Sequence, residues 1–361
     1  MAVGKAGSTE NGSTENDFFV LTMNAAFYVL SGCSQPLLMT SLKDAGVADP
    51  TCQLYMFFYY LGPASFIFTL LGGRSDWPSY RAITKAVGIA LFDIVAAAMN
   101  YTGASMAGPT IFAIVYSSVT VWAALFSQLF LGRKMNLGQW MFVLVVFGGL
   151  TLTTSRSMHL GHDVVNGLVL ILFGSMMHAL TYVMCEAIMT IGEHTLTIRQ
   201  NCAIQGLVAA SMYLLWIAVY AYPRFEQKIW EPMQAAGSTI SHASFLLVAF
   251  GLSNTVHSIT FFHTLKKFPG GATSAGVMKG LQAVLVFVLT NWAYCGRIGG
   301  EEMCFTQGKF LSLVTVTGGV VGYGYATQKR RQVELRQEAG YEEVANVGVD
   351  PSEMENFVPI D

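Results

Sequence analysis

Charged residues are scarce in this sequence, and their scarcity argues against a soluble globular enzyme. Only 12% of the 361 residues are Asp, Glu, Lys or Arg, about half the share found in soluble domains. The 20 basic residues do not exceed the 22 acidic ones, so no nucleic-acid partner is expected either. Six cysteines in a chain of this length are too few for a disulfide scaffold.

Long apolar runs are abundant instead. Hydrophobic residues make up 53% of the chain, and the mean hydropathy is +0.48. Ten apolar stretches, each able to cross ~30 Å of hydrocarbon as a helix, are separated by short polar segments. They span residues 18–40, 53–72, 82–101, 107–131, 137–155, 164–189, 199–222, 243–264, 271–295 and 308–327. We therefore predict an all-α polytopic membrane protein with ten transmembrane helices.

Two other interpretations of these stretches fit less well. A soluble helical bundle needs a charged face that repeats every three or four residues, and residues 89–91 and 143–150 offer none. A cleavable signal peptide needs a basic segment before its apolar core. The first stretch instead follows seventeen polar residues with an acidic balance.

The distribution of Lys and Arg between alternate loops predicts the orientation in the membrane. With both termini in the cytosol, thirteen of the 20 basic residues fall on the cytosolic side, six on the other side, and Lys279 within a stretch. The cytosolic set is Lys5, Arg74, Arg81, Lys85, Arg133, Lys134, Arg199, Lys266, Lys267, Lys329, Arg330, Arg331 and Arg336. An even number of helices with both ends in the cytosol follows.

A weak internal repeat divides the chain into halves. An offset of 161 residues places Asp93 over Asn254 and Ser118 over Lys279, and this period equals five helices. An odd number of spans per copy gives the copies opposite orientations, as in the inverted repeats of secondary transporters. The predicted organisation is a cytosolic tail at 1–17, a five-helix repeat at 18–155, a connecting loop at 156–163, a second repeat at 164–327, and a disordered cytosolic tail at 328–361.

Three segments of the first half carry a resemblance to a known family. They are Asp-Ile-Val-Ala-Ala-Ala-Met-Asn-Tyr-Thr-Gly-Ala-Ser at 93–105, Phe-Leu-Gly-Arg-Lys-Met-Asn-Leu-Gly-Gln-Trp at 130–140, and Phe-Gly-Gly-Leu at 147–150. They resemble the third to fifth helices of the EamA-like drug/metabolite transporter superfamily, and within it the solute carrier family 35 group, which includes nucleotide-sugar transporters. The second half is compatible, with Ala-Thr-Ser-Ala-Gly-Val-Met-Lys at 272–279 and a Gly-rich last helix.

The resemblance implies a ten-helix carrier that alternates access to a central cavity between its two five-helix halves. It also implies an endomembrane location (Golgi, endosomal or vacuolar) rather than the plasma membrane. Nucleotide-sugar carriers of the superfamily have a Gly-Ala-Leu-Asn-Lys motif in the ninth helix and a Phe-Tyr-Asn-Asn run in the seventh. This chain has Gly-Val-Met-Lys at 276–279, one residue shorter and without the Asn, and lacks the other run. These departures weaken the case for a nucleotide-sugar cargo.

Among the ionisable residues inside the stretches, Asp93 and Lys279 stand out and indicate a polar cavity. A charge at the bilayer centre costs about 2.5 to 3.5 kcal/mol on insertion scales, so such residues normally face a bundle interior or water. We expect Lys279 to hold an anionic part of the cargo, while Asp93 either pairs with Lys279 in the empty carrier or takes up a proton. The alternatives are a permanent structural ion pair between them, or snorkelling from helix ends.

Polar residues at helical spacing in four stretches point to the same cavity. A spacing of three or four residues places side chains on one helix face. The stripes are Asn24, Tyr28, Ser31 and Gln35; Ser175, His178, Tyr182 and Glu186; Asn254, His257 and Ser258; and Gln282 one turn beyond Lys279. Each of them could instead bond a neighbouring helix, for about 0.6 kcal/mol, Glu186 could mark a cytosolic helix end, and the histidines could make transport proton-linked. The predicted substrate-binding residues are Lys279, Asp93, Gln282, Asn254, His257, Gln35, Ser31, Tyr28, His178 and Tyr182.

Other motifs leave alternatives open or are missing. Cys295 and Cys304 could form a disulfide in an oxidising lumen or remain free thiols. The Gly-x-x-x-Gly motifs at 276–280 and 318–322 suit either a homodimer face or contacts within the chain. The sequence contains no Cys/His spacing typical of zinc sites and none of the hydrolase, metalloprotease or phosphate-loop motifs. We therefore expect no enzyme, no cofactor and no metal.

The sequence favours a secondary transporter that moves a small polar, anionic metabolite of the nucleotide-sugar-like class by alternating access. Its expected partners are a small-molecule substrate and the lipid bilayer. The second hypothesis is a proton-coupled exporter of cationic or amphipathic compounds that uses Asp93. A third, a receptor or regulatory protein that transports nothing, predicts an odd span count or a large extramembrane domain, and the sequence indicates neither.

Overall fold

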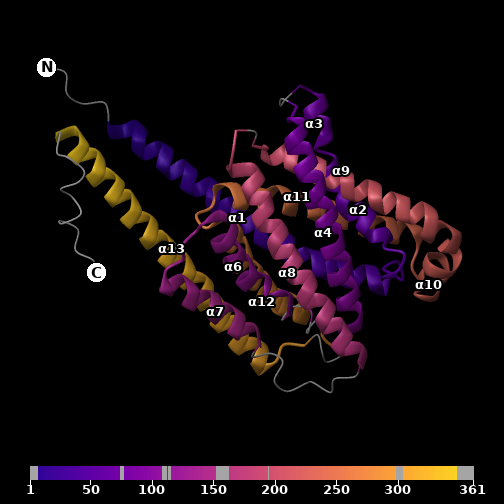
Figure 1. Cartoon of the computed structure of the whole chain (residues 1–361). Helices are drawn as coiled ribbons and strands as arrows, with labels where there is room; N and C mark the ends of the chain where they lie inside the picture. The colour runs from indigo at the N-terminus through magenta and orange to yellow at the C-terminus, as the bar shows by residue number, and fades with distance from the viewer. Residues whose placement is uncertain are drawn as a thin grey trace.

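The computed structural model describes residues 7–73, 77–107, 112, 115–151, 162–193, 195–297 and 304–347. Within these ranges the chain is helical and contains no strand. Long helices lie side by side in a bundle, and α1 and α13 extend from it toward the two termini (Figure 1). The predicted all-α class is confirmed.

Each of the ten apolar stretches contains a helix. In the first half these are α1 (Gly7–Asp44), α2 (Leu54–Ala64) with α3 (Ile67–Leu71), α4 (Tyr80–Ala107), α6 (Val119–Leu131) and α7 (Leu137–Thr151). In the second half they are α8 (His162–Thr190), α9 (Ile198–Trp216), α11 (Ile240–Lys267), α12 (Gly271–Tyr294) and α13 (Gln307–Val347). Short helical turns, including η3 (Glu226–Trp230) and α10 (Glu231–Ala235), connect α9 to α11.

Seven helical segments are long and apolar enough to cross a membrane. They begin at Leu54, Tyr80, Val165, Ile198, Ile240, Gly271 and Gln307. Two shorter apolar helices are Val119–Leu131 and Leu137–Gly149. The seven spans establish a polytopic membrane protein, whereas ten crossings in two inverted repeats stay a prediction.

The terminal helices extend further than the sequence suggested. Residues 328–347, expected to form a disordered tail, continue α13 as a helix to Val347. This segment is rich in Gln, Arg and Glu, which are good helix formers, and a helix already nucleated in the bundle propagates at little cost. Likewise α1 begins at Gly7, inside the predicted tail at 1–17. The predicted connecting loop at 156–163 lies mostly outside the described residues.

The outside of the bundle is apolar, and its interior contains buried polar side chains beside an apolar core. Leu129, Phe245 and Trp292 are 72%, 68% and 81% exposed, whereas buried polar side chains gather between the helices. A soluble protein rarely exposes large contiguous apolar patches, so this surface suits contact with lipid tails. The most extensive helix contacts join α4 with α8, α1 with α11, α7 with α13, and α2 with α9, and α6 lies against α12.

Two predicted packing motifs make contacts within the chain. An added Cβ at Gly276 would lie 3.1 Å from Cα of Thr120 on α6, and the hydroxyl of Thr120 donates to the carbonyl of Gly276 at 2.8 Å. A Cβ at Gly322 would collide with the ring of Phe142 on α7. These glycines therefore allow α12 and α13 to approach the first half closely.

Candidate functional site

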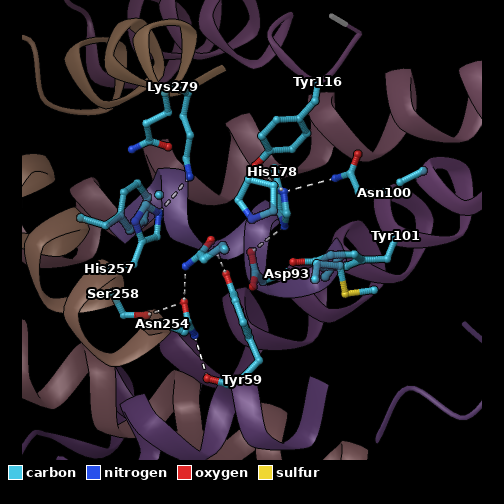
Figure 2. A pocket seen from close by; sticks show the side chains of 18 of the residues that line it. Tyr59, Asp93, Asn100, Tyr101, Tyr116, His178, Asn254, His257, Ser258 and Lys279 are labelled. Atoms are coloured by element: carbon cyan, nitrogen blue, oxygen red, sulfur yellow. Dashed lines mark hydrogen bonds and ion pairs between the residues drawn. The ribbon is translucent and has the colours of Figure 1, made fainter. Parts of the chain in front are cut away.

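A cavity of about 430 Å³ lies between the helices of the bundle, within the range typical of small-molecule sites. Residues from α1, α2, α4, α8, α9, α11 and α12 line it, and Figure 2 shows the polar side chains that project into it. Eight of the ten predicted site residues contribute to the lining: Lys279, Asp93, Gln282, Asn254, His257, Gln35, His178 and Tyr182. Tyr28 and Ser31 lie behind this lining, in contact with His257.

Lys279 projects from α12 toward His257 of α11 (Figure 2). Its ammonium nitrogen lies 2.8 Å from Nε2 of His257 and 5.5 Å from the centre of the Tyr28 ring. The described residues pair this ammonium with no carboxylate. One side of the cavity therefore carries a cation whose only bonded partner in the described structure is an imidazole.

The hydrogen bonds around His257 define its proton arrangement. The hydroxyl of Ser31 lies 2.6 Å from the carbonyl oxygen of Phe27, to which it donates, and 3.1 Å from Nδ1 of His257. Because that hydroxyl proton is engaged, Nδ1–H is the donor to Ser31 and Nε2 is left as the acceptor. A neutral imidazole in this tautomer accepts from a charged Lys279. The Tyr28 ring stacks on the imidazole at 4.7 Å and fixes its orientation.

Asp93 projects from α4 on another side of the cavity (Figure 2). Its carboxylate accepts from the Tyr60 hydroxyl at 3.0 Å and the Thr181 hydroxyl at 3.3 Å, and lies 3.3 Å from Nε2 of His178. On the far side of that imidazole, Nδ1 lies 3.2 Å from the amide of Asn100 and 3.2 Å from the Tyr116 hydroxyl. Since Nδ1 accepts from the amide, Nε2–H donates to Asp93.

These contacts correct one expectation. An ion pair between Asp93 and Lys279 was one of the predicted alternatives, and the structure does not contain it. Each group instead bonds a different histidine, Asp93 with His178 and Lys279 with His257. The reason is geometric: α4 packs on α8 and α12 packs on α11, so each charge meets the imidazole of its adjacent helix first.

A proline in α2 positions the amide cluster at the third side of the cavity. Pro63 has no N–H to donate to the carbonyl of Tyr59, four residues earlier, so that oxygen is free to accept elsewhere. The Asn254 amide donates to it at 2.8 Å and accepts from Gln35 at 3.2 Å. The helix itself ends at Ala64 and resumes as α3. Pro63 thus interrupts the helix predicted at 53–72. The carbonyl that it leaves free lets Asn254 of α11 bond α2, and the same amide bonds Gln35 of α1.

Several residues that face the cavity were missed by sequence reasoning. They are the tyrosines Tyr59, Tyr60, Tyr101 and Tyr116, together with Asn100 and Thr181. Tyr was counted as apolar in the hydrophobic stretches, although a buried hydroxyl usually needs a hydrogen-bond partner. The run Met-Phe-Phe-Tyr-Tyr at 56–60 has Tyr at its last two positions where Phe would be equally apolar, and this could have indicated polar contacts for Tyr59 and Tyr60.

Three predicted stripe residues lie outside the lining. Asn24 donates to the Thr260 carbonyl, and Ser175 donates to the carbonyl of Ile171 within its own helix. Glu186 is fully buried, pairs with Arg133, and accepts from the N–H of Ala272 at 2.7 Å at the start of α12. It is therefore more than a helix end, because an anion at this position complements the positive end of the α12 dipole.

The lining of the cavity reaches one end of the bundle and does not include Glu186 or Arg133 at the other. Its lining extends to Lys43, Ala48 and Pro50 in and after the last turn of α1, on the side predicted to be non-cytosolic. At the opposite end, the contact of Glu186 with Arg133 and the first turn of α12 joins α6, α8 and α12.

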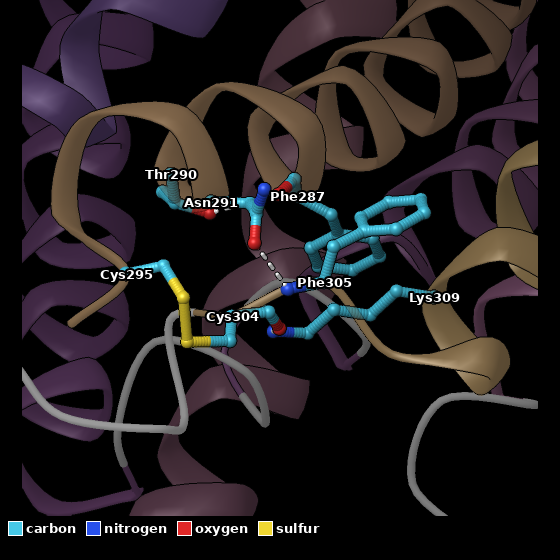
Figure 3. The surroundings of a disulfide bond; sticks show 7 residues. All are labelled: Phe287, Thr290, Asn291, Cys295, Cys304, Phe305 and Lys309. Carbon is cyan, nitrogen blue, oxygen red and sulfur yellow. Dashed lines mark hydrogen bonds between the residues drawn. A yellow bond between two sulfur atoms is a disulfide. The ribbon is translucent and has the colours of Figure 1, made fainter.

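The loop between α12 and α13 carries a disulfide between Cys295 and Cys304 (Figure 3). Beside it, the backbone N–H of Phe305 donates to the Asn291 side chain at 2.6 Å, and Lys309 donates to the carbonyl of Cys304 at 2.8 Å. The sequence left open whether these cysteines are bonded or free, and in the structure they are bonded. Disulfides form and persist in oxidising compartments, which agrees with the non-cytosolic side predicted for this loop.

An apolar-coated helical bundle around a chamber that contains charged groups is typical of membrane transporters, and the comparisons agree. The family model of the EamA-like transporters matches residues 40–155. Solute carrier family 35 member F6 of Homo sapiens is 25% identical over 219 residues, which cover 56% of this chain and 57% of that protein. The protein of the same name from Rattus norvegicus is 24% identical over 232 residues, 59% of each chain.

The chain spans little more than half the length of the curated relatives it matches. One solved crystal structure superposes with a TM-score of 0.60 at 15% identity, over 82% of this chain and 98% of its own, which shows likeness of fold alone. The chain is an integral membrane protein similar to transporters. Its similarity is to the drug/metabolite transporter superfamily, close to solute carrier family 35, and the resemblance read from the sequence is confirmed.

Proposed function

We propose that the protein is a secondary transporter that moves a small anionic metabolite by alternating access between two inverted five-helix repeats. The observation that carries the proposal is Lys279: a cation in a cavity of about 430 Å³, paired with an imidazole and with no carboxylate among the described residues. A buried charge is costly without a counter-charge, so an anionic ligand is the complement that this side of the cavity lacks.

The pattern of helix neighbours supports the inverted repeat. A two-fold relation exchanges α1 with α8, α2 with α9, α4 with α11, α6 with α12, and α7 with α13. Under this exchange the contact of α1 with α11 becomes that of α8 with α4, and the contact of α2 with α11 becomes that of α9 with α4; all four are among the most extensive contacts of the bundle. The pairs α2–α9, α6–α12 and α7–α13 map onto themselves. Smaller contacts, such as α9 with α11, follow the exchange less closely.

Alternating access is supported by the unequal ends of the cavity. Its lining extends to Pro50 at one end, whereas Glu186 and Arg133 join three helices at the other. A carrier of this kind exposes its site to one side at a time. An endomembrane location, in the Golgi, endosomes or vacuole, belongs to the same proposal and is supported by the similarity to solute carrier family 35.

The second candidate, a proton-coupled exporter of cationic or amphipathic compounds, is favoured by the Asp93 side of the cavity. The carboxylate and the imidazole of His178 are 3.3 Å apart and both face the cavity. A carboxylate beside an imidazole is a typical element of proton relays in membrane carriers. A cation would then displace the proton at Asp93.

Uptake into proteoliposomes separates the two candidates. A panel of radiolabelled anions and cations is offered to the wild type, Lys279→Gln and Asp93→Asn, with the exposed Lys85→Gln as the matched charge-loss control. We expect Lys279→Gln to reduce anion uptake about 100-fold, because about 3 kcal/mol is typical for losing one partner of a buried charge pair. Lys85→Gln should transport like the wild type. If Asp93→Asn alone abolishes uptake, and uptake is of cations down a pH gradient, the exporter replaces our proposal.

A further inference from the structure

A second pocket, of about 400 Å³, lies at the end of the bundle where Arg133 contacts Glu186, opposite to Pro50. It is formed where the turn between α6 and α7, the turn between α11 and α12, and the outer part of α13 meet. It shares no lining residue with the central cavity. In the orientation proposed above, this pocket opens at the level of the cytosolic leaflet, because its basic residues belong to the loops assigned to the cytosol.

The charge of this pocket is strongly one-sided. Four of its lining residues are basic, Arg133, Lys134, Lys267 and Arg330, and none is acidic. Glu186 pairs with one guanidinium nitrogen of Arg133, while the other, Nη1, is buried without a hydrogen-bond partner among the described residues. Among the described residues, Arg133, Lys134 and Lys267 together outnumber Glu186, and a bound anion would reduce their mutual repulsion.

The neutral part of the lining suits a phosphate group. Tyr323 and Gln139 are buried in the wall, and the amide of Gln139 donates to the Thr327 hydroxyl at 3.1 Å. Gly270 has a φ of 85°, which lets the chain turn sharply before α12 and keeps this part of the pocket free of a side chain. The remaining cations, Lys134 and Lys267, are exposed at the mouth.

Two helices that line the pocket also carry exposed apolar side chains on the outer surface. Leu137 on α7 and Tyr325 on α13 are 77% and 68% exposed, and both helices contribute to the lining. A ligand that enters here can therefore keep an acyl chain along the helices while its headgroup occupies the pocket. Basic pockets between transmembrane helices on the cytosolic side are suited to anionic headgroups.

We propose that this pocket is a second, separate binding site for a phosphate-bearing polyanion, presented either by a phosphoinositide of the membrane or by a soluble polyphosphate. The recognising groups are the same for both sources: Arg133 within the pocket, with Lys134 and Lys267 at its mouth. Charge-assisted hydrogen bonds from guanidinium to phosphate supply the affinity and the orientation.

The test uses the full chain in phosphatidylcholine nanodiscs. One arm adds phosphatidylinositol 4,5-bisphosphate to the lipid, and the other adds soluble inositol hexakisphosphate to phosphatidylcholine nanodiscs; native mass spectrometry and thermophoresis report binding. The pocket variant is the double substitution Lys134→Gln with Lys267→Gln. The matched control is Arg81→Gln with Lys85→Gln, two exposed cations of α4 on the same predicted side of the membrane and outside the pocket.

We expect saturable binding to the wild type and the control, and about 30-fold weaker binding to the pocket variant, since each basic residue contributes about a factor of five. Tighter binding in the lipid arm assigns the phosphoinositide, and tighter binding in the soluble arm assigns the polyphosphate. Equal losses in both double variants would mean general surface attraction and would overturn the site. Binding by neither ligand would overturn it as well. Transport is not needed for this readout, so the result is independent of the proposed cargo.

Discussion

The two charged sides of the central cavity differ in how completely the protein surrounds them. Asp93 accepts hydrogen bonds from Tyr60, Thr181 and His178, whereas the one hydrogen-bond partner of Lys279 among the described residues is His257. Because a buried charge is costly unless its hydrogen-bonding capacity is used, the carboxylate is compensated by the protein and the ammonium is compensated only in part. The carboxylate is thus part of the internal hydrogen bonding of the fold, and the ammonium is the group that we propose binds the ligand.

Removing each charge in turn gives the largest test of this comparison. Asp93→Ala leaves the Tyr60 hydroxyl and Nε2–H of His178 without their acceptor, whereas the Thr181 hydroxyl keeps the carbonyl of His178 at 2.8 Å. We expect this variant to lower the free energy of unfolding by about 3 kcal/mol. Lys279→Met replaces an incompletely compensated charge with an apolar side chain of similar length, so its effect on stability should be within about 1 kcal/mol of zero or stabilising. Unfolding in mixed micelles, followed by circular dichroism, measures both. Equal losses for the two variants would contradict the comparison.

A smaller effect on transport is expected from Ser31, whose hydroxyl contacts His257, the partner of Lys279. Ser31→Ala removes the acceptor for Nδ1–H of His257, so the imidazole is no longer held in the tautomer that accepts from Lys279. We expect KM for the anionic cargo to rise about fivefold, which corresponds to one hydrogen bond, with kcat nearly unchanged. Ser175→Ala is the matched control, because that hydroxyl donates only within α8. An equal rise in KM in both variants would contradict the idea that the Ser31 hydroxyl orients His257 for Lys279.

The smallest effect concerns a carboxylate outside the spans. Burial alone would raise the pKa of Asp49, but hydrogen bonds from the Thr51 hydroxyl, from the N–H groups of Cys52 and Thr51, and from Lys228 hold it below its usual 3.8. The lowered folded-state pKa gives a stabilisation that is present above the unfolded pKa and is lost as the pH falls through the folded one. The difference in Tm between the wild type and Asp49→Asn should therefore shrink between about pH 5 and about pH 2. A constant difference would contradict this assignment.

The fold was largely predictable because hydropathy determines which segments cross a membrane. Every apolar stretch contains a helix, and the interior location of Asp93 and Lys279 followed from the cost of charge in lipid. Helix ends were less predictable: nothing in the hydropathy of residues 328–347 distinguishes a polar helix from a polar tail. The break at Pro63 was visible as a residue, but the stretch around it is apolar throughout.

The pairing of the site residues could not be predicted. Whether Asp93 meets Lys279 or His178 depends on which helices pack together and on the rotation of each about its axis, and a sequence periodicity fixes only which residues share a face. The same limit applies to Glu186, whose partner Arg133 is contributed by the other half of the chain. Periodicity identified the polar faces, and the helix packing determined their partners.

The proline of α2 has a consequence for sequence change. The carbonyl of Tyr59 is open to the Asn254 amide because Pro63 cannot donate to it. Replacing Pro63 by Ala would restore a donor within the helix, which would then compete with that amide for the same oxygen. The two positions, on separate halves of the chain, are therefore epistatic: a substitution tolerated at one depends on the residue present at the other.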